Sequence, residues 1–305
     1  MPDLVECVPN FSEGRKVETV ESIAHAIESV ETACVLDTHF DPDHNRSVIT
    51  FVAEPTFVVE AAVRAVARAS ELIDMRSHTG VHPRLGATDV LPFVPIRGVT
   101  LDDCALLAHA AGDRIARELS IPVYFYERAA RRSDRVNLED VRRGALELLI
   151  EQIALDPERA PDVGIARVHE TAGAIAVGAR PFLIAFNVNL RSNDIAIARQ
   201  IARAVRARQG GLPFLKALGF ELQTRGMVQV SMNVVNYEVT GMKEAYDAVR
   251  READRLGVEI AGAEIVGLVP RSALDRDAEY FSKLENFSED KILENRLARC
   301  YQTPK

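Results

Sequence analysis

The feature that most constrains the fold is an alternation of short strand-like runs with longer amphipathic helical segments. Apolar residues recur at helical spacing over residues 17–27 and 58–72, and runs rich in valine and isoleucine stand between these segments. The same order of segments returns after residue 181. An alternation of this kind predicts sheets with helices packed on them, which is an α/β (α+β) architecture.

The first half is predicted to be a split βαβ arrangement with an extension, its sheet covered by helices on one face. Pro92 and Pro95 cannot donate to a strand ladder, so their strand is predicted at an edge or a strand end. Thr100 with Asp103 has the spacing of a capping box. The predicted elements are strand 3–9, helix 17–27, strand 34–38, strand 47–52, helix 55–72, strand 90–96, helix 100–115 and strand 121–126.

The second half repeats the βαββαβ order. Residues 127–160 are charged and poor in strand formers, so they predict a peripheral excursion with helices. Residues 161–180 are the richest in glycine and alanine and are interpreted as a hinge. The elements predicted beyond it are strand 181–190, helix 194–208, strands 220–223 and 228–236, a helix capped by Thr240 and running to 256, a last strand from 258–260 and 264–270, and a charged helical tail. We therefore expect two ferredoxin-like βαββαβ-type subdomains, residues 1–180 and 181–305, with a ligand cleft between them.

Composition excludes several classes of protein. The chain has 305 residues, of which 47% are apolar and 27% charged, as in soluble globular proteins. A formal net charge of -8 without a long basic block argues against nucleic-acid binding. No apolar run reaches the roughly 18 residues of a membrane span, and the N-terminus lacks signal-peptide features. Scattered cysteines without a C-x-x-C pair fit the cytoplasm, and dinucleotide, P-loop and serine-hydrolase motifs are absent.

Residues 74–89 concentrate titratable side chains on a segment that cannot stay helical. Gly80, Pro83 and Gly86 interrupt the preceding helical pattern, and His78 and His82 lie there among arginines and aspartates. Histidine gains and loses a proton near neutral pH, so this segment is predicted to be the active loop. The alternative is an exposed histidine with no role. A zinc site is disfavoured because the glycine and proline break the helix that an i, i+4 histidine pair requires.

Other polar side chains stand at the predicted strand ends, where ligand sites tend to form. Asn187 and Asn189 are two positions apart on a strand and share a face. Amides are costly to bury without partners, so this pair either lines the ligand site or is satisfied by another strand. Arginines such as Arg46, Arg84 and Arg180 can bind carboxylates bidentately, which suits a substrate with several carboxyl groups.

Several blocks of the sequence together resemble the glutamate formimidoyltransferase family. They are residues 4–14, 45–46, 72–76, 82–86 with Asp89, 178–180, 182–190 and 266–270, and the likeness extends to about residue 285. The resemblance implies transfer of the formimino group from N-formimino-L-glutamate to N5 of tetrahydrofolate, a step of histidine degradation. It also implies folate bound between two α/β subdomains, tetrahydrofolate as co-substrate, no metal, and a cytoplasmic homodimer that binds neither nucleic acid nor membrane.

The resemblance also assigns roles to individual residues. His82, the histidine of the H-P-R-L-G block, is implied to be the catalytic acid/base. The implied folate-binding residues precede the G-A-R block and are Val163, Gly164, Ile165, Ala166, Arg167, Val168, His169, Glu170, Thr171 and Ala172. Within that segment Arg167, His169 and Glu170 replace small, apolar or aromatic residues of the mammalian form.

The remaining candidates bind substrate or stabilise charge. They are Asn10, Asp37, His39, Asp41, Asn45, Arg46, Arg84, Asp89, Asn187 and Asn189. His39 stands where the mammalian form has an aspartate, so that a carboxylate role there passes to Asp37 or Asp41.

Two other functions remain open at this level. Mammalian members of the family are fused to a cyclodeaminase, and this chain is expected to be the stand-alone bacterial type. A formyltransferase acting on N-formylglutamate or 5-formyltetrahydrofolate uses closely related chemistry, because C=O and C=NH differ by one proton-bearing atom. A folate-binding protein without turnover is the alternative from a different class.

Overall fold

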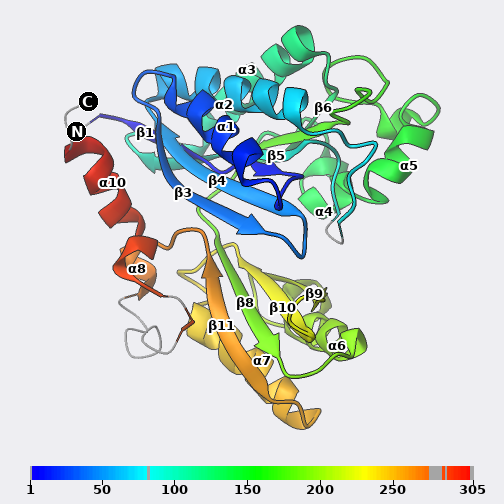
Figure 1. Ribbon diagram of the computed structural model, residues 1–305, viewed down its shortest axis with the longest axis vertical. Helices are drawn as coiled ribbons and strands as arrows, with labels where there is room; N and C mark the ends of the chain where they lie inside the picture. The colour runs from blue at the N-terminus through cyan, green and yellow to red at the C-terminus, as the bar shows by residue number, and fades with distance from the viewer. Residues whose placement is uncertain (1, 81–82, 275–283, 286, 303–305) are drawn as a thin grey trace. The chain divides into compact units, whose positions relative to one another are not determined.

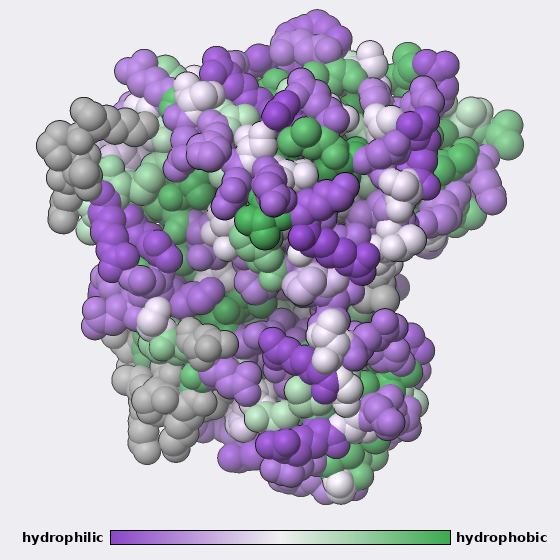
Figure 2. All heavy atoms as spheres, viewed as in Figure 1, coloured by the Kyte–Doolittle hydropathy of each residue, from purple (hydrophilic) through white to green (hydrophobic). Residues whose placement is uncertain are grey.

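The structure is a computed structural model that describes residues 2–80, 83–274, 284–285 and 287–302. The chain divides into two compact units, the first ending at Pro181 and the second beginning at Phe182. Each unit has its own sheet and its own hydrophobic core (Figure 1). Over the described residues, no helix combines the length and apolarity that crossing a membrane requires. Hydrophilic side chains occupy much of the face drawn in Figure 2.

The first unit is built on a βαββαβ core. Its elements are β1 Leu4–Cys7, β2 Asn10–Phe11, α1 Val17–Glu28, β3 Cys34–Asp41, β4 Arg46–Ala53, α2 Pro55–Leu72, β5 Thr88–Arg97, α3 Leu101–Leu119, β6 Val123–Glu127, α4 Leu138–Val141, α5 Ala145–Gln152 and β7 Ile175–Ala179. The short strands β1 and β2 both pair with β4 on one side and β5 on the other, and β3 pairs with β4. These pairings are antiparallel, and β7 and β6 extend the sheet in parallel beyond β5. The predicted split βαβ order with an extension is confirmed.

Helices α1, α2 and α3 pack on one face of this sheet (Figure 1). As predicted, Pro55 occupies the first turn of α2, and Thr100 and Asp103 form a reciprocal capping box at the start of α3. The prediction of helices on one face only is wrong. Alternate residues of β6 and β7 face a second apolar cluster that contains Val141 of α4 and Leu149 of α5. The charged 127–160 excursion therefore folds back and covers the far face of the extension.

The prediction that the proline-containing strand lies at an edge is also wrong. β5 is central, because it pairs with β1 and β2 on one side and with β7 on the other. Pro92 lies opposite the break between β1 and β2, where its carbonyl accepts a hydrogen bond from the Val8 amide at 3.3 Å. Pro95 lies beyond Phe93, the last residue of β5 that pairs with β7. At both places the missing proline N–H costs no ladder bond.

The glycine- and alanine-rich segment that was interpreted as a hinge ends in a buried strand. β7 lies between β5 and β6, and all five of its residues are buried. A Cβ at Gly178 would lie 2.5 Å from Cε1 of Tyr126. Small residues are present here because an aromatic ring packs directly on the backbone, which is a packing requirement and not a signal of flexibility.

The second unit is a four-stranded antiparallel sheet in the order β11-β8-β10-β9. Its elements are β8 Ile184–Leu190, α6 Ile195–Val205, β9 Leu215–Leu222, β10 Met227–Val234, α7 Met242–Arg255, β11 Ile260–Val266, α8 Arg271–Leu274 and α10 Leu293–Gln302. Residues of α6 and α7 join one face of the sheet in a single apolar cluster. This is the predicted ferredoxin-like βαββαβ order.

Two local predictions in the second unit need correction. Thr240 does not cap α7. It is fully buried and its hydroxyl donates to the Pro213 carbonyl at 2.5 Å, while Gly241 is the residue at the cap position. β9 begins at Leu215 and is longer than predicted, since Gly219 lets the strand approach α6, where a Cβ would lie 2.6 Å from the Arg199 amide.

Candidate active site

The predicted active loop connects α2 to β5 without regular structure over most of its length. α2 ends at Leu72, before the glycines and the proline that interrupt the helical pattern, and β5 begins at Thr88. His82, the predicted acid/base, lies outside the described residues. The groups on either side of it, from His78 and from Arg84 to Asp89, are described and define the surroundings of the loop.

A small pocket of the first unit lies beside this loop. Its lining residues come from three stretches that are distant in sequence and are Phe11, Ser12, His44, Asn45, Arg46, His78, Arg84 and Asp89. Four of the predicted site residues, Asn45, Arg46, Arg84 and Asp89, are thus brought together. The space between these residues, including the part that is open to solvent, is about 220 Å³.

The Asn45 side chain links its own turn to the two other stretches that line the pocket. Its backbone is left-handed with φ of 49°, a conformation that asparagine tolerates better than most residues. Its Oδ1 accepts a hydrogen bond from the Gly14 amide at 3.0 Å, and its Nδ2 donates to the Thr79 carbonyl at 2.9 Å. The loop after β2, the β3–β4 turn and the active loop are therefore fixed relative to one another by one side chain.

His78 links the Arg84 guanidinium to the backbone of Asn45. Its Nδ1 lies 3.0 Å from Nε of Arg84, which can only donate, so Nδ1 must be the acceptor. Its Nε2 lies 3.1 Å from the Asn45 carbonyl oxygen and therefore carries the hydrogen. Burial lowers the pKa of His78, which favours this neutral tautomer. The pair of bonds fixes the orientation of Arg84.

The 127–160 excursion supplies residues that sequence reasoning missed. The Leu146 amide donates to the Arg84 carbonyl at 2.9 Å, and the Glu147 carboxylate pairs with the Arg84 guanidinium at 2.9 Å. Arg142 forms a close ion pair with Asp89, whose Oδ1 also accepts a hydrogen bond from the Leu85 amide at 2.9 Å. Nothing in a charged run of sequence indicated that it docks on the active loop.

Arg46 provides a buried positive charge in the pocket. Burial, and then the like charge of Arg142, lower its pKa to about 10, while Asp89 and Asp41 oppose that shift. The guanidinium therefore remains protonated at neutral pH. Asp41 lies 2.5 Å from Nδ1 of His44. Burial raises the pKa of Asp41, but its bonds to His44 outweigh this and the net direction is downward, so Asp41 is held as a carboxylate.

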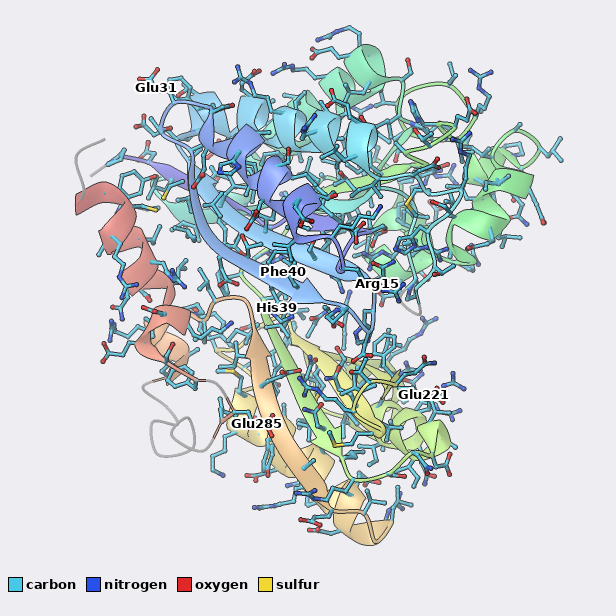
Figure 3. The ribbon with its side chains drawn as sticks, viewed as in Figure 1. Arg15, Glu31, His39, Phe40, Glu221 and Glu285 are labelled. Carbon is cyan, nitrogen blue, oxygen red and sulfur yellow. The ribbon has the colours of Figure 1, made fainter. Side chains whose placement is uncertain are left out.

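The other predicted residues of the first unit share one sheet face. Asp37, His39 and Asp41 alternate along β3 with residues such as Phe40, which packs toward the helices (Figure 3). They are paired across the sheet with Thr50, Val48 and Arg46 of β4. Asn10 is buried and its amide donates to the Val8 carbonyl at 2.8 Å.

Glu6 is a buried acid that the sequence analysis did not single out. It lies on β1 between the apolar core residues Val5 and Cys7, so its side chain points to the sheet face away from the helices. Only 1% of it is exposed. Burial raises its pKa to about 7, and the positive charge of Arg180 offsets only part of that effect. A single glutamate within a short, otherwise apolar strand does not indicate from the sequence that its carboxyl group is buried.

The implied folate segment, residues 163–172, lies beside the active loop. The Met75 amide donates to the Thr171 carbonyl at 2.8 Å, and the Ala87 amide donates to the Ala172 carbonyl at 2.9 Å. Glu170 pairs with Arg76 at 2.8 Å on the exposed side. The contact of residues 163–172 with folate stays a prediction. The backbone hydrogen bonds join this segment to the active loop.

Gly86 allows that close approach, and its replacement by alanine is expected to destabilise the first unit. A Cβ there would lie 2.2 Å from the carbonyl oxygens of both Ala172 and Ala174, which are backbone atoms that cannot turn away. Overpacking of this kind costs about 1–3 kcal/mol. Urea unfolding followed by circular dichroism measures the change. Glu21→Ala is the control, because Glu21 is exposed on α1 of the same unit. Equal losses in the two variants would contradict the steric explanation.

In the second unit, Asn187 and Asn189 belong to an amide and carboxylate network on one sheet face. Gln229 of β10 donates to Oδ1 of Asn189 at 2.9 Å and to Glu264 of β11 at 3.2 Å. Asn187 donates to the same Glu264 oxygen at 3.3 Å. Each of the two side-chain amides therefore has a hydrogen-bond partner on another strand. A role for either asparagine in binding substrate stays a prediction.

Metal ligation finds no support in the part of the chain that the structure describes, where no group of three histidine, cysteine or acidic side chains could hold an ion. Cys7 and Cys104 are buried, and burial raises the pKa of both thiols, that of Cys104 to about 12. Neither is suited to act as a thiolate at neutral pH.

Comparison with known families accounts for both units. Residues 4–180 match the model of the formiminotransferase domain, N-terminal subdomain, and residues 185–299 match the formiminotransferase domain. The chain belongs to the formiminotransferase family. The boundaries of the two matches agree with the division of the structure into units near residue 181.

Individual relatives support the same family along nearly the whole chain. The chain is 48% identical to the glutamate formimidoyltransferase of Thermoplasma acidophilum and 44% identical to that of Streptococcus pyogenes, each over 97% of this chain and 98% or more of the relative. It is 43% identical to the formimidoyltransferase-cyclodeaminase of Rattus norvegicus over 97% of this chain but 57% of the relative. The blocks that carried the resemblance in the sequence thus belong to a formiminotransferase.

Proposed function

We propose that this formiminotransferase transfers the formimino group from N-formimino-L-glutamate to N5 of tetrahydrofolate, giving L-glutamate and 5-formiminotetrahydrofolate. The observation that carries the proposal is the pocket in which a buried Arg46 lies with Arg84, on a loop whose backbone is hydrogen-bonded to residues 171 and 172. Membership of the family and the names of the two full-length relatives support the choice of donor and acceptor.

The charged groups of the pocket suit the donor. N-formimino-L-glutamate carries two carboxylates, and Arg46 and Arg84 offer guanidinium groups that bind carboxylates bidentately. His78 orients Arg84 by accepting a hydrogen bond from the Arg84 Nε. The two terminal nitrogens of the guanidinium can make other contacts, and Nη2 donates to the Glu147 carboxylate. Binding two large ligands side by side makes their reaction effectively intramolecular.

We assign the proton transfers to His82. N5 of the reduced pterin attacks the formimidoyl carbon and must lose a proton, and the departing glutamate nitrogen must gain one. A single imidazole with a pKa near 7 can perform both tasks in sequence. His78 is unsuited to this role because both of its ring nitrogens are occupied by positioning bonds.

A carboxylate near the reacting amidine would favour its cationic character during transfer. Of the three acids that the sequence left open, Asp89 is engaged by Arg142 and by the Leu85 amide. Asp41 is engaged in the same way by the ring and the backbone amide of His44, so the role falls to Asp37 on the same face of β3. The homodimer, the cytoplasmic location and the place in histidine degradation that the resemblance implies stay predictions.

The proposed donor is tested by a single-turnover assay with purified protein and tetrahydrofolate. N-formiminoglutamate and N-formylglutamate are supplied in parallel, and 5-formiminotetrahydrofolate and 5-formyltetrahydrofolate are resolved by chromatography. We expect product from the formimino donor only. Product from the formyl donor only would replace the proposed reaction by formyl transfer, and folate binding without product from either donor would indicate a binding protein.

A further inference from the structure

A second pocket of the first unit is formed by the 127–160 excursion and β6, and it shares no lining residue with the active-site pocket. It is lined by Tyr124 of β6 and by residues of the excursion that include three acids and three arginines, Arg135, Arg143 and Arg159. The proposed reaction assigns no role to any of them. The three arginines differ in how their charges are compensated.

Arg159 is a buried cation whose hydrogen bonds all go to neutral groups. Only 8% of it is exposed. Its Nη1 and Nη2 donate to the carbonyl oxygens of Val141 at 3.4 Å and of Arg143 at 3.1 Å, and its Nε is buried without a hydrogen-bond partner in the described part of the chain. An arginine stays protonated in a protein, and burying a charge without compensation is costly. Among the described residues, no carboxylate forms an ion pair with Arg159.

Arg135 lines the same pocket and is equally buried, but it has a counter-charge. Its Nη1 lies 2.8 Å from Oδ2 of Asp162, and the two side chains are 5% and 4% exposed. Asp162 also accepts a hydrogen bond from the Phe125 amide at 2.8 Å, so its carboxylate is fully engaged at this place. The fold therefore supplies a carboxylate for one buried arginine of the pocket and, within the described residues, none for the other.

The three acids that line the pocket form no hydrogen bond or ion pair with the buried guanidinium in the described part of the chain. Asp134 binds Arg132 through both carboxylate oxygens at 2.9 Å, and Oδ2 of Asp140 accepts a hydrogen bond from Nδ2 of Asn137 at 3.1 Å. Glu158 is exposed, and its side chain makes no hydrogen bond or ion pair with the described residues. The buried guanidinium is thus left to a counter-charge from outside the protein.

Arg143 supplies a second positive charge beside Arg159. The two residues are in direct contact, because the Arg143 carbonyl accepts the hydrogen bond from Nη2 of Arg159. Arg143 is exposed, and its side chain forms no hydrogen bond or ion pair with the described residues. Guanidinium groups bind carboxylate and phosphate through paired, charge-assisted hydrogen bonds. We propose that this pocket binds a small oxyanion, a carboxylate or phosphate group, which supplies the counter-charge of Arg159 and is also held by Arg143.

Titration calorimetry with inorganic phosphate and, in parallel, with sodium acetate tests the site without any turnover. We expect Arg143→Met to weaken binding about tenfold, because the anion loses one charge-assisted partner. This variant should unfold at the same urea concentration as the wild type, since its side chain makes no hydrogen bond or ion pair with the described residues. Tighter binding of phosphate would identify a phosphate-bearing ligand, and tighter binding of acetate a carboxylate-bearing one.

Glu158→Gln tests the charge of the pocket in the opposite direction. Removing this negative charge from the lining takes away a repulsion, so phosphate should bind about threefold more tightly. Arg117→Met is the matched control for the arginine variant. It removes the same charge from an exposed position of α3, where Arg117 pairs with Glu118 at 3.0 Å. Its affinity for phosphate is expected to equal that of the wild type.

Arg84→Met distinguishes this site from the active-site pocket, which also contains arginines. It should retain the phosphate binding that Arg143→Met loses. No binding of either anion by the wild type, equal affinities of Arg143→Met and the wild type, or a loss in Arg84→Met as large as that in Arg143→Met would overturn the proposal. Because no substrate of the proposed reaction is used, a failure of that reaction would leave these results unchanged.

Discussion

Replacement of His82 by alanine is expected to lower the single-turnover rate at least about a hundredfold, because one imidazole is assigned both proton transfers. The loss should appear in the rate of formimino transfer at saturating substrates, with tetrahydrofolate binding close to that of the wild type. Rapid-quench measurement of 5-formiminotetrahydrofolate gives the rate. The pH profile of that rate should lose its dependence on a group that titrates near 7.

His25→Ala is the matched control for this experiment. His25 lies in α1 on an exposed position and takes no part in the pocket. It should retain the full rate and the full pH profile. If His82→Ala folds normally, binds tetrahydrofolate and still turns over within about tenfold of the wild type, another group carries the proton and the assignment is wrong.

Replacement of Glu6 by glutamine is expected to stabilise the first unit, and to do so mainly above neutral pH. Burial raises the pKa of Glu6 from 4.5 to about 7 in the folded protein. The folded state therefore holds a proton that the unfolded state releases, so stability falls as the pH rises from about 4.5 to about 7. One pKa unit corresponds to about 1.4 kcal/mol, which gives a loss of about 3 kcal/mol once the group is ionised in both states.

Urea unfolding at pH 5 and pH 8 tests this linkage. Glutamine cannot ionise, so the difference in unfolding free energy between Glu6→Gln and the wild type should grow by about 2.5 kcal/mol between these two pH values. Glu18→Gln serves as the control because Glu18 is exposed on α1 and should show no such growth. A stabilisation that is the same at both pH values would show that burial of the ionised carboxylate is not its cause.

Glu6 lies on the same face of the sheet as Asn10 and Asp41, two of the predicted site residues. Functional groups are commonly retained at a cost in stability, because a site poised for charge or hydrogen bonding is incomplete without its ligand. The two expected results therefore concern different aspects of the enzyme, its chemistry at His82 and the stability cost of Glu6.

Local sequence patterns predicted most of the helices and strands. Periodicity located α1 and α2, Pro55 marked the start of α2, and the box of Thr100 with Asp103 marked the start of α3. The order βαββαβ was visible twice because each strand and helix is specified by residues within about ten positions of one another. The local pattern predicted that Thr240 caps α7, but its hydroxyl instead donates to the Pro213 carbonyl. The sequence pattern alone did not distinguish these two roles.

The irregular loop between α2 and β5 was also predictable, because glycine and proline interrupt a helix at that point whatever surrounds it. Asn45, Arg46, Arg84 and Asp89 were all predicted and all line one pocket. The sequence did not distinguish their tasks. Asp89 is predicted to bind substrate or to stabilise charge, and the sequence did not indicate that its carboxylate binds Arg142.

The sequence by itself determined which segments are helix and strand, and where the loop after α2 interrupts the helical pattern, since both are encoded by neighbouring residues. Only the tertiary structure decided that β5 is central despite its prolines, that Glu6 is buried, and that Arg142 reaches Asp89 across 53 positions of chain. Contacts of that kind form when separate elements dock, and their energies depend on burial and on distances that no local pattern specifies.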